Sequence, residues 1–401
     1  MRLTIINQFY TPDISPTAHL CASLAEHRAA RGDEVTVITS RSGYVGGVGA
    51  VPRSGGAVRV CRVWSSRLGS RTNLRRFLDW ATFYLPAAVR ALTLPRQDVI
   101  IALTTPPFIT LAGVAHKVLH PSTKLVLWNM DCYPEAVERT GLVRTGGWVA
   151  GVMRAMNRAL FRRLDRAVCL DGAMKHLLSS QYTLHSGESG WQVIPNWERA
   201  TMFPKEARDA ACRLGGAKFT VLYLGNAGYG HEFATTLRAA EMLRDEPVNF
   251  LFVGGGALRP WIEQERDRLG LTNIELRDYV SKEQTPELMR SAGCALITLE
   301  ESMLGVMSPS KLHANLATGL PVIYVGPRGS NVDEAIARHG CGASLRPGDA
   351  QGMAVLIRRW MTDTAEHERL RARARATFEE AYCDEKTLPQ FDALLAELFP
   401  E

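Results

Sequence analysis

The segment at residues 308–311, Ser-Pro-Ser-Lys, is the sharpest chemical signal in the sequence. Pro309 and Ser310 are typical of the first positions of a helix, where backbone N–H groups have no partner within the helix. Such N–H groups, together with the compact positive charge of Lys311, suit a diphosphate. The alternative is a capped surface helix with an exposed lysine. The functional interpretation is favoured because residues 319–323, Gly-Leu-Pro-Val-Ile, return the chain directly to a buried strand.

A glycine-rich segment at residues 225–232 follows a predicted strand and precedes a predicted helix. It reads Gly-Asn-Ala-Gly-Tyr-Gly-His-Glu, and its glycines allow the backbone to approach a ligand closely. His231 stands at the start of the helix, where it could contact a phosphate or a sugar. The spacing differs from the G-x-G-x-x-G fingerprint, so an NAD site is disfavoured. A plain tight turn with a solvated His231 remains the alternative.

Two further loops follow predicted strands. The run Gly254-Gly255-Gly256 indicates either a close backbone approach to a nucleotide base or ribose, or a simple strand-to-helix turn. Residues 326–331 favour a structural interpretation, with Ser330 as a helix cap.

Two carboxylates, Asp131 and Glu135, follow the predicted strand at 124–128. They could hold acceptor hydroxyls or help to deprotonate one. The alternative is a turn that starts a helix, with acids near the helix N-terminus. Their spacing alone does not indicate a metal site.

Alternating strands and helices must position these loops. Buried strands are predicted at 3–9, 35–38, 99–103, 124–128, 167–170 and 193–194, and a second series at 219–224, 249–253, 274–276, 295–299 and 322–325. Strands that alternate with helices form parallel sheets with right-handed crossovers. The predicted fold is therefore α/β, with two doubly wound domains, an interdomain cleft and helical final residues. Ligands of such sheets bind outside the carboxyl ends of the strands.

Composition excludes several other classes of protein. Apolar residues make up 46% of the 401 residues, and 47 Lys and Arg against 41 Asp and Glu give a net charge of only +6, which disfavours a nucleic-acid binder. The eight cysteines are scattered singly, without zinc spacing, which indicates a reduced cytoplasmic protein without a structural metal. Neither a signal peptide nor a membrane span is predicted.

Basic residues cluster beside aromatic ones in the first half. Arg67, Arg71, Arg75 and Arg76 precede Phe77, Trp80, Phe83 and Tyr84, and a second group comprises Arg154, Arg158, Arg162, Arg163 and Arg166. Basic groups beside amphipathic apolar residues suit an anionic membrane surface. The alternative is a solvated helix face above an ordinary core.

The sequence resembles the glycosyltransferase family 4 enzymes of the branch that builds O-antigen, colanic acid and other exopolysaccharides. The resemblance runs nearly end to end, and its short motifs occur in a specific order. They are Tyr10-Thr11-Pro12, Thr105-Pro106-Pro107-Phe108, Asp131-Cys132-Tyr133-Pro134-Glu135, Ile194-Pro195-Asn196-Trp197, Tyr223-Leu224-Gly225-Asn226 with His231-Glu232-Phe233, and Pro309-Ser310-Lys311-Leu312.

The resemblance implies a GT-B fold of two Rossmann-like domains. It implies an acceptor-binding domain at 1–196, a nucleotide-sugar-binding domain at 197–375 and a helix at 376–401 that packs back on the first domain. It further implies sugar transfer with retention at the anomeric carbon and without a metal or other cofactor.

The resemblance also implies roles for individual residues, by their positions in the matching motifs. The resemblance assigns Gly225, Asn226, Ser310 and Lys311 to the donor diphosphate, Gly255, Tyr279 and Val280 to the base and ribose, Met307 and Ser308 to the donor sugar, and Tyr10, Asp131 and Glu135 to the acceptor. Asp131, His231 and Lys311 are the expected catalytic residues.

The sequence also departs from the family. Many members carry two glutamates eight positions apart, one near the donor sugar and one on the ribose, where this chain has Val306 and Ala314. Neither side chain can replace a carboxylate, so sugar and ribose recognition must differ in detail. Tyr229 also occupies a place where basic residues are frequent.

The predicted function is a hexosyl or N-acetylhexosaminyl transfer from a nucleotide sugar, UDP rather than GDP, to a polyprenyl-diphosphate-linked saccharide. The expected location is cytoplasmic, at the inner face of the cytoplasmic membrane, with no nucleic-acid partner. Two alternatives remain open: a nucleotide-sugar 2-epimerase of the same fold, and a catalytically inactive GT-B module in a polysaccharide assembly complex.

Overall fold

The computed structural model describes residues 1–13, 15–41, 58–66, 68, 73–203, 218–281 and 284–399. Arg67 and Arg71 of the first basic group lie outside these residues. The chain forms two compact units: residues 1–170, 174–195 and 388–401 make the first, and residues 171–173 and 196–387 make the second.

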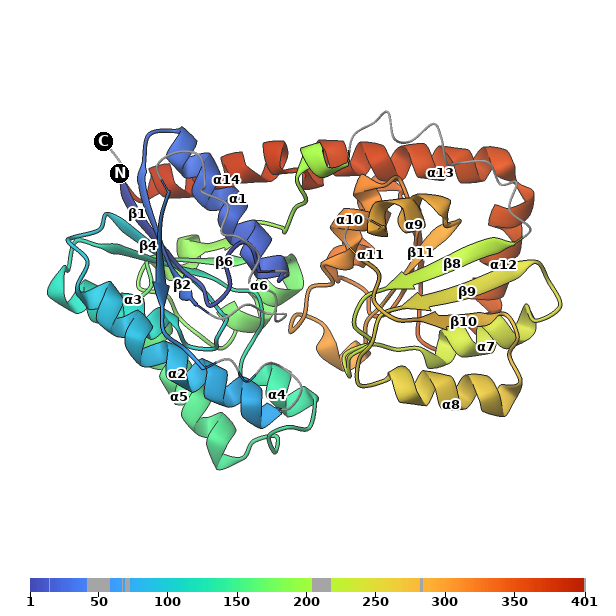
Figure 1. Ribbon diagram of the computed structural model, residues 1–401, viewed down its shortest axis with the longest axis horizontal. Helices are drawn as coiled ribbons and strands as arrows, with labels where there is room; N and C mark the ends of the chain where they lie inside the picture. The colour runs from blue at the N-terminus through green and yellow to red at the C-terminus, as the bar shows by residue number, and fades with distance from the viewer. Residues whose placement is uncertain are drawn as a thin grey trace. The chain divides into compact units, whose positions relative to one another are not determined.

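The first unit is built on a seven-stranded parallel sheet in the order β3-β2-β1-β4-β5-β6-β7 (Figure 1). Its strands are β1 (Arg2–Ile6), β2 (Glu34–Ser40), β3 (Val58–Val63), β4 (Val99–Leu103), β5 (Lys124–Trp128), β6 (Arg166–Cys169) and β7 (Trp191–Val193). Its helices are α1 (Pro16–Ala30), α2 (Asn73–Leu92), α3 (Thr110–Leu119), α4 (Glu135–Arg139), α5 (Trp148–Phe161) and α6 (Gly172–Ser179), whose first residues belong to the second unit. The central strand β4 is buried throughout, as expected for a sheet covered on both faces.

The second unit contains a six-stranded parallel sheet in the order β10-β9-β8-β11-β12-β13. Its strands are β8 (Phe219–Leu224), β9 (Val248–Val253), β10 (Ile274–Arg277), β11 (Cys294–Thr298), β12 (Val322–Val325) and β13 (Gly342–Leu345). Its helices are α7 (Ala234–Met242), α8 (Arg259–Leu269), α9 (Thr285–Ser291), α10 (Lys311–Ala317), α11 (Asn331–His339), α12 (Ala350–Thr362) and α13 (Thr364–Thr377). Helix α12 packs against α7, whereas α13 packs against α10 and α11, so helices cover both faces.

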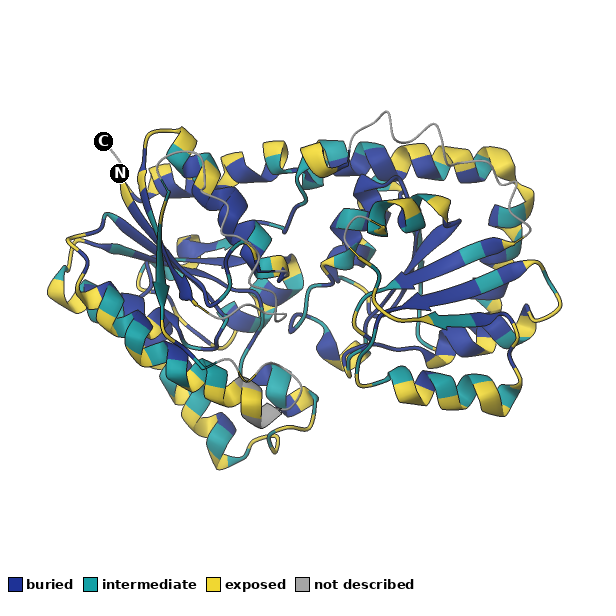
Figure 2. Cartoon of the chain, in the orientation of Figure 1, coloured by how far each residue is buried: buried dark blue, intermediate teal, exposed yellow. Residues whose placement is uncertain are grey.

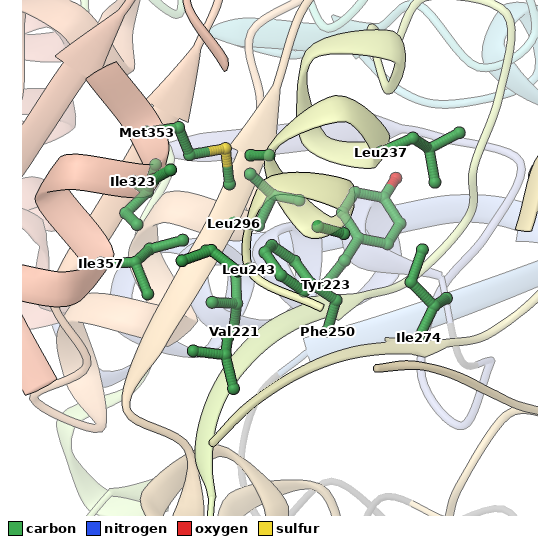
Figure 3. Packing of buried hydrophobic residues seen from close by; sticks show 14 of the residues in the cluster. Val221, Tyr223, Leu237, Leu243, Phe250, Ile274, Leu296, Ile323, Met353 and Ile357 are labelled. Atoms are coloured by element: carbon green, nitrogen blue, oxygen red, sulfur yellow. The ribbon is translucent and has the colours of Figure 1, made fainter. Parts of the chain in front are cut away.

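An apolar core fills the space between this second sheet and the helices α7 and α12. Val221 and Phe250 of the sheet belong to one cluster with Leu243, which directly follows α7, and Ile357 of α12 (Figure 3). Tyr223 belongs to the same core and is 1% exposed, yet its hydroxyl has hydrogen-bond partners at the edge of the sheet. Each aliphatic side chain of this kind stabilises the fold by about 1.5–3 kcal/mol, so the loops rest on a rigid base.

The prediction of two doubly wound parallel-sheet domains is confirmed. Strands β3 and β13 were not predicted. Each is an edge strand whose residues are mostly half-buried, so neither shows the continuous apolar run that identified the central strands.

The last helix, α14 (Asp384–Glu397), begins in the second unit and ends in the first. At the start of α14, the Asp384 carboxylate accepts a hydrogen bond of 3.0 Å from the backbone N–H of Ala200. Further along, Phe391 packs edge-on against Trp128 of β5, with ring centroids 4.8 Å apart. Besides the short segment at 171–173, the chain therefore passes to the second unit after residue 195 and returns to the first after residue 387.

Candidate functional site

Lys311 begins α10, and its ammonium lies against the carboxyl end of β8 in the second unit. Its Nζ donates to the Tyr223 hydroxyl at 2.7 Å, lies 3.4 Å from the Asn226 carbonyl oxygen and 3.4 Å from His231 Nε2. It also stands 4.3 Å from the centroid of the Tyr223 ring. The structure thus brings Gly225, Asn226, His231 and Lys311 together in one cluster.

The hydrogen bonds determine which atom donates and which accepts in each neighbour of this lysine. His231 Nδ1 lies 2.8 Å from the Thr298 carbonyl oxygen and must donate to it, which leaves the Nε2 lone pair facing Lys311. The Tyr223 hydroxyl donates to the Asn226 carbonyl at 2.8 Å, and therefore accepts from Lys311. All three groups around the ammonium are neutral.

Burial sets the electrostatics of the cluster. Removal from water lowers the pKa of Lys311 to about 7. Burial, and secondarily the charge of Lys311, lowers the pKa of His231 to about 3, although the bond to Thr298 opposes this shift. His231 is therefore a neutral imidazole near pH 7, with its Nε2 3.4 Å from the Lys311 ammonium.

Lys311 forms no ion pair with any carboxylate among the residues that the structure describes. A half-buried cation surrounded by neutral groups attracts an anion strongly, because no counter-charge must first be displaced. The arrangement suits a phosphate oxygen.

Glycines bring the neighbouring backbone close to this amine. Gly225 has φ 126°, and a Cβ there would lie 2.9 Å from Lys311 Cε. Gly254 has φ 124°, and a Cβ there would lie 2.4 Å from the Gly225 carbonyl oxygen. Only glycine fits either position, so the loops after β8 and β9 are packed against each other.

An exposed aromatic ring covers the second glycine loop. The Tyr279 side chain is 65% exposed, and a Cβ at Gly255 would lie 3.3 Å from its Cε2. Val280 follows it, half-buried. The guanidinium of Arg259, which the sequence did not suggest, supports the loop by donating to the carbonyls of Gly254 and Arg277 at 2.5 and 2.9 Å.

The loop between β11 and α10 contains the remaining donor predictions. Met307 and Ser308 are half-buried, and a Cβ at Gly230 would lie 2.7 Å from Met307 Sδ. Ser310 is exposed and its side chain makes no capping bond to the seven-residue helix α10. Ser330, in contrast, accepts from the Asp333 N–H at 3.2 Å, which confirms its predicted cap.

The acceptor predictions lie in the first unit, after β1 and β5. Tyr10 is 2% exposed and Glu135 4%, so both are buried, while Asp131 is half-buried. The Thr104 hydroxyl accepts from the Asp131 N–H at 3.1 Å, joining the ends of β4 and β5. Burial raises the pKa of Asp131 to about 6.

Glu135 faces a cation inside the unit. Arg154 Nε lies 3.8 Å from Glu135 Oε1, while the same guanidinium also hydrogen-bonds both oxygens of Glu138. Among the acceptor predictions, Asp131 is thus the one with a partly accessible carboxylate.

Within the described ranges, no group of three or more His, Cys, Asp or Glu side chains is arranged to hold a metal ion, and no helix is long and apolar enough to span a membrane.

Two doubly wound parallel sheets, with Lys311 beside the carboxyl ends of the strands of the second, define a two-domain α/β protein of the class that binds ligands at that edge of the sheet. Two family models match the chain in succession: a glycosyl transferase 4-like domain over residues 17–197, and glycosyl transferases group 1 over residues 218–363. The chain belongs to this glycosyltransferase family and has its GT-B fold.

Individual proteins agree with that assignment. The chain is 26% identical over 339 residues to the putative colanic acid biosynthesis glycosyl transferase WcaI of Escherichia coli, covering 80% of this chain and 82% of that protein. Sucrose-phosphate synthase from Thermosynechococcus elongatus matches with a TM-score of 0.73, 16% identity and coverage of 100% and 99%. Anabaena HepE in complex with UDP and glucose matches with a TM-score of 0.71, 14% identity and 99% coverage of both chains.

Proposed function

We propose that this glycosyltransferase moves a hexosyl or N-acetylhexosaminyl group from a UDP-sugar to a polyprenyl-diphosphate-linked saccharide in cell-surface polysaccharide biosynthesis, with retention and without a metal. The observation that carries the proposal is the unpaired ammonium of Lys311 among neutral groups. WcaI, named for colanic acid biosynthesis, supports the pathway class, and HepE, bound to UDP and glucose, supports the donor class.

Lys311 would act on the leaving group. When the bond between the anomeric carbon and the diphosphate oxygen breaks, negative charge grows on that oxygen. A preorganised ammonium stabilises this charge in the transition state more than in the bound donor. The uridine base would stack on Tyr279, which is exposed beside Gly255.

Asp131 would accept a hydrogen bond from the acceptor hydroxyl. With a pKa of about 6, its carboxylate is ionised at neutral pH and can orient that hydroxyl for attack. The new bond joins the anomeric carbon to the acceptor oxygen, on the face that the leaving group vacates.

The donor assignment is tested by Lys311→Ala, with Lys218→Ala, an exposed lysine of the same unit, as the matched control. UDP, GDP and ADP are screened by thermal shift, and UDP release is then measured with a lipid-linked acceptor fraction. UDP should raise the Tm of the wild type most, and Lys311→Ala should lower kcat/KM by about 10²–10³-fold.

Three results would count against the proposal. Equal behaviour of the Lys311→Ala and Lys218→Ala proteins would remove the diphosphate assignment. A free epimerised sugar nucleotide formed without acceptor would indicate the epimerase, and nucleotide binding without turnover would indicate the inactive module.

We also propose that the first unit rests on an anionic membrane surface through α2, α3 and α5. Helix α2 packs along α3, which contacts α5, and their outer faces are largely exposed in Figure 2. The large exposed apolar side chains there are Phe77, Leu78, Leu85, Val89 and Leu92 of α2, Leu111, Val118 and Leu119 of α3, and Trp148 and Val152 of α5. Helices α3 and α5 contain basic residues and no acidic residue, which suits anionic lipid.

Trp148, 82% exposed at the start of α5, gives the sharpest membrane test. Trp148→Ala should weaken sedimentation with phosphatidylglycerol vesicles about tenfold, since an inserted aromatic ring contributes roughly 1.5–3 kcal/mol. Trp261→Ala in α8 of the second unit is the control and should bind as the wild type does. Equal binding of both variants, or equal binding to neutral vesicles, would exclude this surface.

A further inference from the structure

Glu300 lies two residues after the end of β11, and its carboxylate is a candidate ligand-binding group. The two positions at which many family members carry glutamates are Val306, which is fully buried, and Ala314. A sugar presents several hydroxyl donors, and a site that discriminates among sugars needs acceptors for them. The loop after β11 must supply these acceptors from other residues.

The backbone places Glu300 beside the lysine cluster. Its N–H donates to the Gly230 carbonyl at 2.9 Å, next to His231. Two residues earlier, Thr298 Oγ1 lies 3.3 Å from His231 Nδ1, so the Thr298 side chain points to the same side as that ring. Glu300 is extended, at φ −65° and ψ 142°. Side chains alternate along extended backbone, so Glu300 points to the same side as Thr298, and the intervening Leu299 is buried on the other.

A second carboxylate, that of Glu232, follows His231 in the chain and offers a further hydrogen-bond acceptor in this region. Glu232, 8% exposed, uses Oε1 to accept from the Thr235 N–H at 2.9 Å, but its buried Oε2 has no hydrogen-bond partner. The backbone bond from Glu300 to Gly230 places Glu300 two positions from Glu232 along the neighbouring loop. Burial, and then the charges of Glu232 and Glu301, raise the pKa of Glu300. A buried acceptor without a donor beside a half-buried carboxylate calls for hydroxyl donors from a ligand.

We infer that Glu300 accepts hydrogen bonds from hydroxyl groups of the transferred sugar and thereby helps to select that sugar. The inference rests on the proposed donor site, and Glu300 takes over the work of the missing family carboxylate from a different position on the loop. In this arrangement Glu300 would act on the sugar and Lys311 on the diphosphate, so the two roles can be tested separately.

The experiment compares Glu300→Gln with Glu301→Gln. Glu301 is the adjacent, exposed carboxylate, so the control changes the same charge one residue away. Binding of UDP, UDP-glucose, UDP-galactose and UDP-N-acetylglucosamine is measured by titration calorimetry, with thermal unfolding as the check that each variant folds. Glu300→Gln should weaken the best-bound UDP-sugar about tenfold or more while UDP itself binds unchanged. Glu301→Gln should match the wild type for every probe.

The outcomes separate the two proposals. A wild type that UDP does not bind contradicts the donor assignment, and the inference falls with it. A wild type that binds UDP, with Glu300→Gln and Glu301→Gln giving the same profile across the UDP-sugars, overturns the inference alone. An equal loss for UDP and the UDP-sugars in Glu300→Gln also overturns it, because the residue would then act on the nucleotide.

Discussion

Lys311 and its three neutral neighbours form a site whose charge depends on pH, because Lys311 gains or loses a proton. The Tyr223 hydroxyl, the Asn226 carbonyl and the Nε2 of His231 orient the ammonium but do not neutralise it. Burial therefore acts almost unopposed and disfavours the charged form. A bound diphosphate would supply the missing counter-charge and favour the ammonium.

UDP affinity should consequently fall as pH rises above 7. With a pKa of about 7 in the free protein, Lys311 is charged below that pH and increasingly neutral above it. Binding then requires proton uptake, and the Kd for UDP should rise between pH 7 and 9, by up to about tenfold per pH unit. Titration calorimetry in buffers of different ionisation enthalpy measures both the Kd and the proton uptake.

Lys311→Arg provides the control for that profile. A guanidinium stays charged across the whole range, so its Kd should be nearly flat from pH 7 to 9. A flat profile for the wild type would mean that Lys311 does not bind the diphosphate or is already fully charged in the free protein.

At the scale of elements, the Asp392 carboxylate of helix α14 joins that helix to charged side chains of α1 in the first unit. Asp392 lies 2.9 Å from His27 Nε2 and 2.5 Å from Arg28 Nη1, and Arg28 also pairs with Asp33 at 2.6 Å. Burial alone would raise the pKa of Asp392, but the hydrogen bonds from His27 and Arg28 overcome it and leave that pKa below its usual value. This interaction is therefore lost when acid protonates the carboxyl.

Asp392→Ala should destabilise the first unit by about 1–3 kcal/mol, because it leaves the largely buried Arg28 with one partner fewer. Glu397→Gln is the control: Glu397 is 53% exposed and 3.7 Å from Arg166, so its loss should cost less than about 0.5 kcal/mol. Urea unfolding measures both. The difference between wild type and Asp392→Ala should be constant above about pH 4 and shrink below it, since the pKa of Asp392 is depressed in the folded state. Equal stability of the two variants at pH 7 would show that α14 is held by its apolar contacts alone.

At the scale of the whole molecule, the chain comprises two units with separate sheets. Proteins of this organisation commonly unfold in more than one step. The residues that we propose to bind the donor, Lys311, His231 and Tyr279, all lie in the second unit, whereas Asp392 lies in the first. A ligand and a mutation can therefore report on different units.

Scanning calorimetry should resolve this division. UDP at about one hundred times its Kd should add about 2.7 kcal/mol to the second unit and raise its transition by roughly 5–10 °C, with the first little changed. Asp392→Ala should lower the transition of the first unit instead. One transition that both perturbations move equally would show that the two units unfold as a single cooperative body.

The sequence predicted most of the fold because central strands of parallel sheets are buried on both faces. The runs at 99–103, 124–128 and 219–224 are continuous apolar stretches between helical patterns, and each is a strand. Edge strands such as β3 lack this signal, and residue types near 58–63 do not distinguish them from loops.

Residue types alone determined that Gly225, His231 and Lys311 stand at the ends of strands, because glycine runs and helix starts are local features. Only the tertiary structure decided what surrounds them. Tyr223 has the pattern of a core residue and is one, yet its hydroxyl meets an amine 88 positions away. Tyr10 and Glu135 were predicted to contact the acceptor, and residue types did not indicate that both are buried. Burial, charge state and partners depend on which strands become neighbours, and that follows from the packing of the whole unit.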